Sequence, residues 1–255
     1  MVHIKGTLER RARTRAERQQ AFLEVSKRIV FTEGLAALTM QRLAAEADCA
    51  VGTAYTYFPS KSTLVAELQR EAIETLESSC QRFLALFDAD VAPHESDPAV
   101  ASLALIVGFG RYWVDTFDTF PEEARLLQLL LSETSPTVSD DDLGRVLPAA
   151  LELLGHTRVA FASAAEAGAL EPGDAMERTV VLAAALNGVL LLGHVARIDP
   201  ELFDGPRLAD SLVRDLLSGW GAGATALATA RRRIDALARR GPLAIASPPR
   251  EGISR

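Results

Sequence analysis

Apolar side chains recur every three or four residues along most of the chain, and this spacing places them on one face of an α-helix. The first such stripe consists of Phe22, Val25 and Ile29, and Gly34 stands where the C-cap of the helix is expected. The pattern therefore predicts a first helix that ends near Glu33.

Two short helices and one long helix are expected next. Residues 39–47 form the first, with Thr39 as its N-cap. Residues 50–58 form the second, and Pro59 ends it because the residue before a proline avoids the helical region. A long helix is then predicted from residue 60 or 61 to about residue 87.

The rest of the chain shows further helical patterns and no convincing strand pattern. A loop is expected at 89–98, which contains two prolines, and the tail 241–255 is rich in Pro, Gly and Ser and is expected to be disordered. The helical patterns lie at 99–118, 121–133, 142–168, 174–196 and 206–238. We therefore predict an all-α fold.

Charge is distributed unevenly along the chain, whose net charge is −7. Residues 1–70 carry 11 Lys and Arg against 7 Asp and Glu, and residues 71–255 carry 16 against 27. Six of the basic residues fall within residues 1–18, which form a basic N-terminal arm. A basic segment ahead of an acidic body is typical of a nucleic-acid-binding module joined to a larger domain, although a solvated charged tail has the same composition.

Composition and motifs weigh against several classes of protein. Two cysteines 31 positions apart and four isolated histidines form no standard zinc site or disulfide scaffold. The longest apolar run, 180–195, is shorter than the roughly 20 residues of a membrane-spanning helix. The N-terminus has charges where a secretory signal has its apolar stretch, so a cytoplasmic protein is expected. No GxSxG, Walker, GxGxxG or HExxH motif occurs, so we expect no catalysis, metal or cofactor.

Residues 39–58 have the spacing of a helix-turn-helix when Met40 is counted as the first position. Two short helices that cross at a wide angle approach closely only if the fifth position is small, and the turn needs a left-handed backbone at the ninth. Asp48 occupies the ninth position, and Asp tolerates the left-handed region better than most residues. The small or apolar positions of the motif are Leu43, Ala44, Ala47, Cys49 and Ala54.

The motif continues into the segment TAYTYFPSK at 53–61. This segment resembles the signature of the tetracycline-repressor (TetR) family of bacterial transcription regulators, and the preceding EGLAALT and TMQRLAAEA are also in register. The resemblance covers about residues 15–65. It implies a three-helix helix-turn-helix DNA-binding domain at 19–66 and a larger helical domain for ligand binding and dimerisation at 67–240.

Three positions depart from the pattern of the family. Ala50 stands where family members often have a Ser or Thr that caps the recognition helix, which costs on the order of 1 kcal/mol. Asp48 replaces a usual glycine and Cys49 a usual small aliphatic residue. These departures affect the angle at which the recognition helix begins rather than the fold.

The resemblance also implies which side chains contact DNA. It assigns the hydroxyl of Tyr55 to a phosphate and allows the same role for Tyr57, with a core position as the alternative for Tyr57. Thr39 and Lys61 lie at helix starts, where free N–H groups favour phosphate, and Phe58 is expected in the core. Base edges are expected to face Ala50, Val51, Gly52, Thr53 and Thr56.

The larger domain offers two interpretations for its aromatic residues, which either pack a core or line a ligand cavity. Asn187 lies within an apolar helix and needs a polar partner, which a ligand or a neighbouring helix across a dimer interface can supply. The candidate ligand-pocket residues are Phe83, Phe87, Phe109, Trp113, Phe117 and Asn187. The resemblance places the dimer interface on the helices at 174–196 and 206–238, with Leu190, Leu191, Leu212, Leu216 and Leu217 as candidates.

These expectations combine into one hypothesis. The chain is expected to bind a palindromic site in double-stranded DNA as a homodimer and to repress transcription until a small, hydrophobic molecule releases it. An activator, or a helix-turn-helix protein without a small ligand, remains an alternative. No partnership with a membrane is expected.

Overall fold

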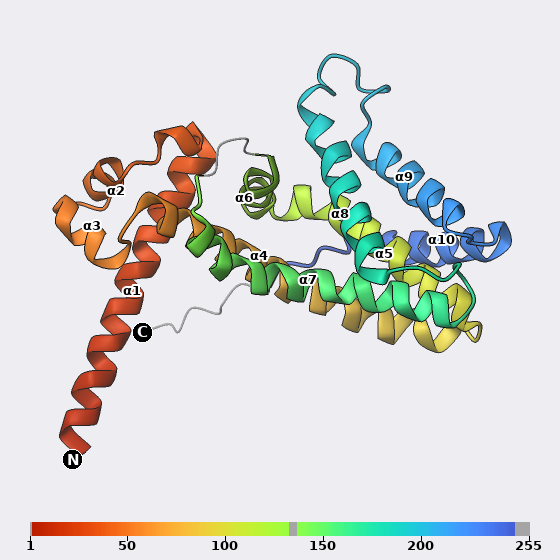
Figure 1. Ribbon diagram of the computed structural model, residues 1–255, viewed down its shortest axis with the longest axis horizontal. Helices are drawn as coiled ribbons and strands as arrows, with labels where there is room; N and C mark the ends of the chain where they lie inside the picture. Colours follow the sequence, from red (N-terminus) through yellow and green to blue (C-terminus); the bar gives the residue numbers. More distant parts are fainter. Residues whose placement is uncertain (1, 133–136, 248–255) are drawn as a thin grey trace. The chain divides into compact units, whose positions relative to one another are not determined.

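The structure is a computed structural model that describes residues 2–132 and 137–247. Every regular element in the described part is a helix, as the sequence predicts (Figure 1). The α-helices are α1 (Val2–Glu33), α2 (Met40–Glu46), α3 (Val51–Tyr57), α4 (Lys61–Asp90), α5 (Pro98–Thr119), α6 (Pro121–Ser132), α7 (Asp140–Glu166), α8 (Ala175–Leu191), α9 (Gly205–Gly219) and α10 (Ala224–Ala238). Single 3-10 turns are η1 (Leu35–Ala37), η2 (Ala92–His94) and η3 (Leu192–His194).

The chain divides into two compact units, of which the N-terminal unit is discontinuous. It consists of residues 1–72 and 125–149, whereas the C-terminal unit consists of residues 73–124 and 150–255. The sequence analysis assigned 125–149 to the larger domain. In the structure Leu126 is buried in the N-terminal core, and Arg125 donates from Nη1 to the carbonyl of Phe31 at 2.9 Å. The local spacing of apolar residues does not indicate contacts between segments that are distant in the sequence.

The core of the N-terminal unit is built on the apolar faces of the first four helices. Phe22 and Phe58 are almost fully buried, and their rings meet edge to face at a centroid distance of 6.3 Å. The predicted core position of Phe58 is thereby confirmed. Leu43 of α2 and Leu64 of α4 complete the same cluster with no exposed surface. Burial of an aromatic or leucine side chain contributes about 1.5–3 kcal/mol, so this cluster holds α2 and α3 against α1.

The C-terminal unit is centred on α5, whose inner positions are buried along the whole helix. Gly108 lets α5 approach α4, because a Cβ at that position would lie 2.7 Å from the ring of Phe83. The hydroxyl of Tyr112 donates to the carbonyl of Leu76 at 2.7 Å, which satisfies a polar group that α5 carries into the core. The helices α8, α9 and α10 pack on α5.

One predicted helix is divided in the structure. The pattern at 206–238 predicts a single helix, but α9 ends at Gly219 and α10 begins at Ala224. Gly221 between them has a φ of 95°, a value that favours glycine, and the amide of Glu171 donates to the carbonyl of Trp220 at 2.9 Å. The prediction of one helix is therefore wrong, because the glycines in this stretch turn the chain back.

The predicted disorder of the tail also fails for the part that the structure describes. Leu243 and Ala244 have no exposed surface. The amide of Leu243 donates to Oδ2 of Asp115 at 2.7 Å, and Nε of Arg82 donates to the carbonyl of Ile245 at 2.9 Å. Residues 241–247, here called the C-terminal strap, thus bridge α4 and α5. Residues 248–255 lie outside the described residues.

Candidate nucleic-acid interface

The helix-turn-helix geometry rests on local interactions that the sequence predicts. The hydroxyl of Thr39 accepts a hydrogen bond from the amide of Arg42 at 3.0 Å, which confirms Thr39 as the N-cap of α2. Asp48 has a φ of 48°, so the left-handed turn expected at the ninth position is present. The amide of Cys49 then donates to the carbonyl of Ala44 at 3.0 Å, and the chain turns into α3.

The recognition helix α3 buries one face and exposes the other. Ala54 has no exposed surface and lies against the core, while Val51 and Thr53 are half-buried at its margins. Ala50 is the N-cap and makes no side-chain cap bond, as its methyl group implies. The residues that this helix presents on its open side are Ala50, Gly52, Tyr55 and Thr56.

Gly52 lies on the open face with no constraint from the chain itself. A Cβ at this position would have no heavy atom within 4 Å. Its φ is also an ordinary helical value, so neither space nor backbone conformation inside the protein requires a glycine. The hydroxyl of Thr56 donates to the Gly52 carbonyl at 3.0 Å, which occupies its donor within the helix.

The two tyrosines of the motif have different environments, as their spacing predicts. Tyr55 is 45% exposed. Tyr57 is half-buried, with its ring centroid 5.3 Å from that of Phe22. The guanidinium of Arg15 stacks over the Tyr57 ring at 5.6 Å from the centroid. Tyr57 therefore combines a packing role with a cation–π contact to a basic residue of α1.

Lys61 has a structural contact that the sequence did not indicate. Its Nζ donates to the carbonyl of Leu35 in η1 at 3.0 Å. The ammonium group has two further donors, so a phosphate contact stays a prediction, but the side chain also ties the start of α4 to η1. At the same helix start, the hydroxyl of Ser60 accepts from the amide of Thr63 at 3.0 Å and caps α4.

The basic N-terminal arm differs from the expectation of a segment ahead of the first helix. Residues 2–18 belong to α1, which runs without interruption from Val2 to Glu33. Arg13 forms an exposed ion pair with Glu17 at 3.5 Å, and Arg18 lies over the ring of Phe22 at 5.7 Å from its centroid. The helix therefore places at least Arg15 and Arg18 on the side of the aromatic cluster, a proximity for which the sequence gives no signal.

Comparison with known families identifies this arrangement. Residues 22–68 match the family model of the bacterial regulatory proteins of the tetR family. Within this segment the chain carries the helix-turn-helix domain of the TetR family. The matched segment begins at Phe22 and ends at Leu68, so it contains the whole helix-turn-helix and the first part of α4. The N-terminal unit therefore contains a helix-turn-helix DNA-binding domain of the TetR type.

Several solved structures share the fold of about four fifths of this chain. The MbdR regulator of Azoarcus sp. CIB is 22% identical, with 79% of this chain and 98% of that chain covered and a TM-score of 0.54. SmeT, the repressor of the Stenotrophomonas maltophilia multidrug efflux pump SmeDEF, is 18% identical over 82% and 92% of the two chains, with a TM-score of 0.53. FadR of Bacillus subtilis, solved in complex with stearoyl-CoA, is 15% identical over 78% and 98%, with a TM-score of 0.53. The comparison with curated proteins found no match.

Three of the candidate ligand-pocket residues pack against one another in the C-terminal unit. Phe83, Phe87 and Phe109 are buried, and the ring of Phe83 lies 5.6 Å from that of Phe109 and 6.4 Å from that of Phe87. Trp113 and Phe117 are half-buried. A cavity of about 10 Å³ is lined by Phe109 and Trp113. Phe83, Phe87 and Phe109 therefore have a packing role, and a ligand-binding role for the set stays a prediction.

Asn187 and the candidate dimer residues occupy different positions in the C-terminal unit. Asn187 is half-buried on α8 and does not line the small cavity beside Phe109. Leu217 is 1% exposed and packs inside its own chain, so its assignment to a dimer surface is wrong. The remaining candidates, which are all half-buried, are Leu190, Leu191, Leu212 and Leu216.

Two further findings bear on partners. Within residues 2–132 and 137–247, no three His, Cys, Asp or Glu side chains are grouped as ligands for a metal ion. Among the described helices, none combines the length and the apolar character needed to cross a membrane.

Burial raises the pKa of the Cys80 thiol to about 12, with a smaller contribution from the neighbouring charge of Glu77.

Proposed function

We propose that this protein is a transcriptional repressor that binds a palindromic operator as a homodimer and leaves it when a small molecule binds. The observation that carries the proposal is the open face of α3. Ala54 is buried on the inner side of this helix, and Gly52, Tyr55 and Thr56 lie on its exposed side. No heavy atom of the chain lies within 4 Å of a Cβ placed at Gly52. A helix of this kind lies in the major groove in helix-turn-helix proteins.

Recognition of the operator would depend on small side chains and on phosphate contacts. The helix α3 carries no Arg, Asn or Gln, which are the side chains that pair with purine edges. Contacts to thymine methyl groups from Ala50 and Val51, together with the hydroxyl of Thr53, are the direct contacts open to it. Tyr55 has an exposed ring and makes no hydrogen bond within the described residues, so its hydroxyl is available to a phosphate.

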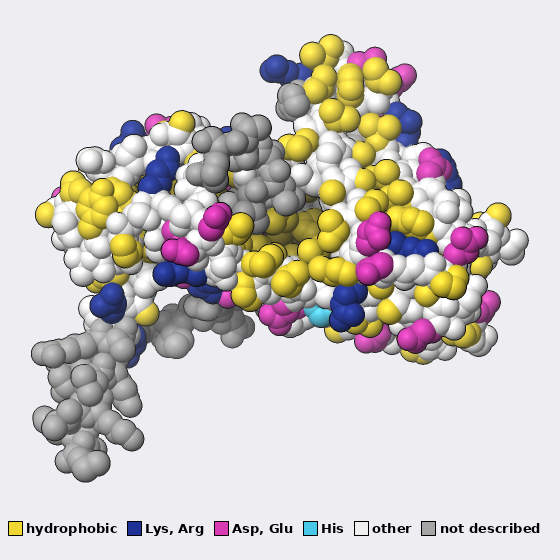
Figure 2. Space-filling model, in the orientation of Figure 1, with side chains coloured by type: hydrophobic (Ala, Val, Ile, Leu, Met, Phe, Trp, Pro, Cys, Tyr) yellow, Lys and Arg dark blue, Asp and Glu magenta, His cyan; other side chains and the backbone are white. Residues whose placement is uncertain are grey.

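An apolar surface on the C-terminal unit supports the proposed homodimer. Figure 2 shows hydrophobic side chains gathered over α8 and the segment that follows it. Val180 and Val181 are exposed on α8, and Ile198 and Leu202 are 75% and 58% exposed after it. Apolar patches of this kind mark interaction sites, and a second copy of the chain is the occupant that a palindromic operator requires.

Release by a small molecule is proposed from the neighbours and from α4. FadR of Bacillus subtilis was solved with stearoyl-CoA, and SmeT is the repressor of a multidrug efflux pump. In this chain α4 is one continuous helix of 30 residues whose first part belongs to the N-terminal unit and whose second part belongs to the C-terminal unit. A ligand that prefers one position of α4 would shift the equilibrium between DNA-binding and non-binding states by its differential affinity for them.

A salt-dependent anisotropy titration tests the DNA-binding part of the proposal. The full chain is titrated onto fragments that flank its own gene, in the presence of unrelated competitor DNA. We expect one fragment to bind far more tightly than the competitor, with an affinity that falls steeply as salt is added. Equal binding to all fragments would contradict the proposal.

Two tyrosine variants test whether the hydroxyl of Tyr55 contacts a DNA phosphate. Tyr55→Phe removes only an exposed hydroxyl, so we expect weaker binding to the selected fragment by about tenfold or more and an unchanged salt slope, because a neutral donor releases no counterion. Tyr57→Phe is the matched control, because the Tyr57 ring packs on Phe22 and retains that packing without its hydroxyl. Equal losses in both variants would show that the assignment of separate roles is wrong.

Light scattering on the full chain tests the dimer. Val181→Glu places a charge on the exposed face of α8 and is expected to shift the population towards monomer. The matched control is Val159→Glu, which adds the same charge at a 54% exposed valine of α7. A monomeric wild-type chain at micromolar concentration would refute the dimer.

A further inference from the structure

Arg15 and Arg18 of α1 carry positive charges that no neighbouring carboxylate balances. Both side chains are exposed, and among the described residues neither forms an ion pair or a hydrogen bond. Each lies instead on an aromatic ring, since the guanidinium of Arg15 is 5.6 Å from the ring centroid of Tyr57 and that of Arg18 is 5.7 Å from the ring centroid of Phe22. The N–H donors of both guanidinium groups are therefore open to an acceptor outside the chain.

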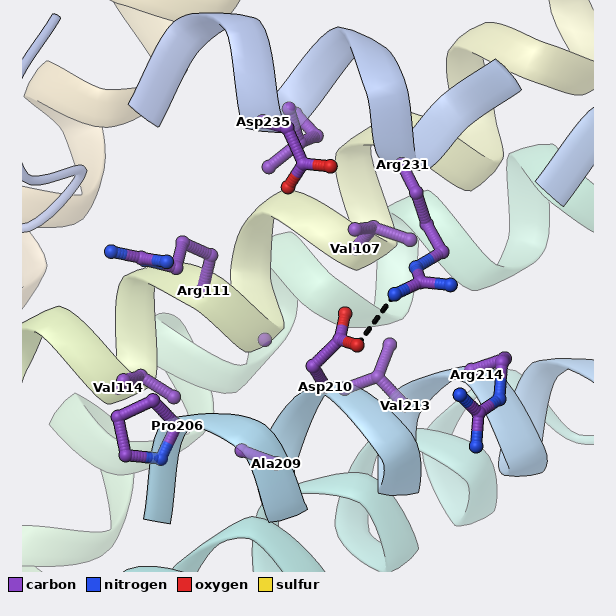
Figure 3. Close-up of a pocket in the computed structure, with 12 residues that line it drawn as sticks. Val107, Arg111, Val114, Pro206, Ala209, Asp210, Val213, Arg214, Arg231 and Asp235 are labelled. Carbon is purple, nitrogen blue, oxygen red and sulfur yellow. Dashed lines mark hydrogen bonds and ion pairs between the residues drawn. The ribbon is translucent and has the colours of Figure 1, made fainter. Parts of the chain in front are cut away.

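Several other cations of the chain are paired with carboxylates. In the N-terminal unit such ion pairs are formed by Arg13, Lys27, Arg28, Arg42, Arg70 and Arg145. The same holds for the three arginines that line a cavity between α5, α9 and α10 of the C-terminal unit, where Figure 3 shows Arg231 beside Asp210. The lack of a carboxylate beside Arg15 and Arg18 is thus a local feature of α1.

The sequence of α1 accounts for this unbalanced face. Residues three and four positions apart are neighbours on a helix, and no such position relative to Arg15 or Arg18 holds Asp or Glu. Arg11 precedes Arg15 by four residues, and like charges at this spacing destabilise a helix, so the face gathers positive charge at a cost. Arg13 lies on another face, where Glu17 is four residues away and pairs with it at 3.5 Å.

The charge of Arg15 is held beside the recognition helix. Tyr57 is the last residue of α3, and its ring also packs on Phe22 of α1 with 5.3 Å between the centroids. Stacking on a ring that is itself packed restricts the position of the guanidinium, so less conformational freedom is lost when it binds a ligand. Tyr55, whose hydroxyl is proposed to contact a DNA phosphate, lies two residues earlier in the same helix. Figure 1 shows α1 running past α3 and continuing beyond it.

We propose that Arg15 and Arg18 form a phosphate clamp that binds the DNA backbone beside the groove in which α3 lies. A guanidinium group presents paired N–H donors that match two oxygens of a phosphate, and stacking on an aromatic face leaves these edges free. Such a contact adds affinity for any duplex and positions the recognition helix without reading bases. The inference deepens the proposed function and rests on its DNA-binding part.

The salt dependence of DNA binding tests the phosphate clamp. The full chain is titrated by fluorescence anisotropy, at several salt concentrations, onto the fragment that wild type selects and onto an unrelated duplex. Each phosphate contact contributes about 0.9 to the slope of log affinity against log salt. With two copies in a dimer, Arg15→Gln is expected to lower the magnitude of this slope by about 2 and to weaken binding to both duplexes by roughly tenfold or more near 0.1 M salt. An unchanged slope would overturn the inference.

Two further variants separate the clamp from a general loss of charge. Arg13→Gln is the matched control, because it removes the same charge from an exposed residue of the same helix that Glu17 already pairs with, and we expect its affinity to change by less than about threefold. Arg15→Lys keeps the charge and is expected to keep the slope. Equal losses in Arg13→Gln and Arg15→Gln, or a slope in Arg15→Lys as low as in Arg15→Gln, would show that no clamp exists at Arg15. Because Arg15 is exposed, urea unfolding of Arg15→Gln is expected to give the wild-type midpoint.

The two duplexes separate this inference from the proposed function. Equal binding of wild type to both duplexes, weakened in Arg15→Gln, would refute the operator-specific repressor and leave the clamp intact. Selective binding to one fragment, with the same salt slope in wild type and Arg15→Gln, would refute the clamp and leave the repressor intact. If wild type binds neither duplex, both are refuted.

Discussion

The glycine at position 52 offers a sharp test of how closely α3 approaches DNA. Gly52→Ala adds one methyl group to the exposed side of the helix, where no heavy atom of the chain lies within 4 Å of the new Cβ. Alanine is favoured over glycine by up to about 1 kcal/mol inside a helix, so we expect the free energy of unfolding to stay the same or rise by that amount. The protein alone therefore gives no reason for weaker function.

The expected cost appears only in the complex. If the backbone of α3 lies against base edges, an added methyl group displaces the helix, and misfits of this kind cost about 1–3 kcal/mol. A dimer carries two copies of the change, so the smallest expected loss is about 2 kcal/mol, or roughly thirtyfold in the dissociation constant. An anisotropy titration on the palindromic operator, together with urea unfolding, measures both quantities on the same preparation.

Gly155→Ala is the matched control for this experiment. Gly155 lies inside α7, and a Cβ there also has no heavy atom within 4 Å. We expect the same gain in helix stability with unchanged operator affinity. If Gly52→Ala binds the operator as tightly as wild type, the close approach of α3 to DNA is refuted. The exposed face of α3 would then not lie against base edges.

Four further expectations follow from individual contacts. Ala50→Ser supplies the missing cap of α3 and should raise the urea midpoint by an amount equivalent to about 1 kcal/mol with an unchanged m-value. Ser62 donates a hydrogen bond to the carboxylate of Asp142, which lowers the pKa of Asp142. The ionised carboxylate therefore stabilises the fold above the unfolded-state pKa of about 3.9, and this stabilisation is lost as the pH falls through the lower folded-state pKa. Urea unfolding from pH 7 down to pH 3 should show that loss in wild type and a smaller one in Asp142→Asn. Leu243→Ala should lower the free energy of unfolding by about 2–4 kcal/mol, measured by urea, because the side chain has no exposed surface, whereas a disordered strap predicts no change. Ellman's reagent at pH 8 should titrate at most one thiol in the folded chain and two after denaturation, because burial raises the pKa of Cys80 to about 12.

The clearest successes of sequence reasoning lie where neighbours along the chain determine the structure. The cap at Thr39, the left-handed turn at Asp48 and the absent cap at Ala50 depend on residues at most a few positions apart. The different environments of Tyr55 and Tyr57 agree with the helical period, because residues two positions apart cannot share one face of a helix.

Contacts between distant segments were decided by the tertiary structure. A stripe of apolar positions tells which face of a helix is buried but not what covers it, so the strap on α4 and α5 and the place of Leu126 in the N-terminal core were not predictable. The amide and carbonyl groups of residues 243–245 find their partners on Asp115, Ser79 and Arg82, which are more than 120 positions away. A stretch rich in Pro and Gly is disordered only when it has no such partners.

The sequence by itself determined a helical protein with a helix-turn-helix head, because helical period, caps and a tight turn are properties of neighbouring residues. The tertiary structure alone decided where the C-terminal unit has room for a ligand. Phe83, Phe87 and Phe109, which the sequence offered for a pocket, are buried, whereas a cavity of about 170 Å³ lies among residues that α9 and α10 bring against α5. Whether side chains meet to fill a volume or leave it open depends on the packing of whole helices, and no local pattern encodes that volume.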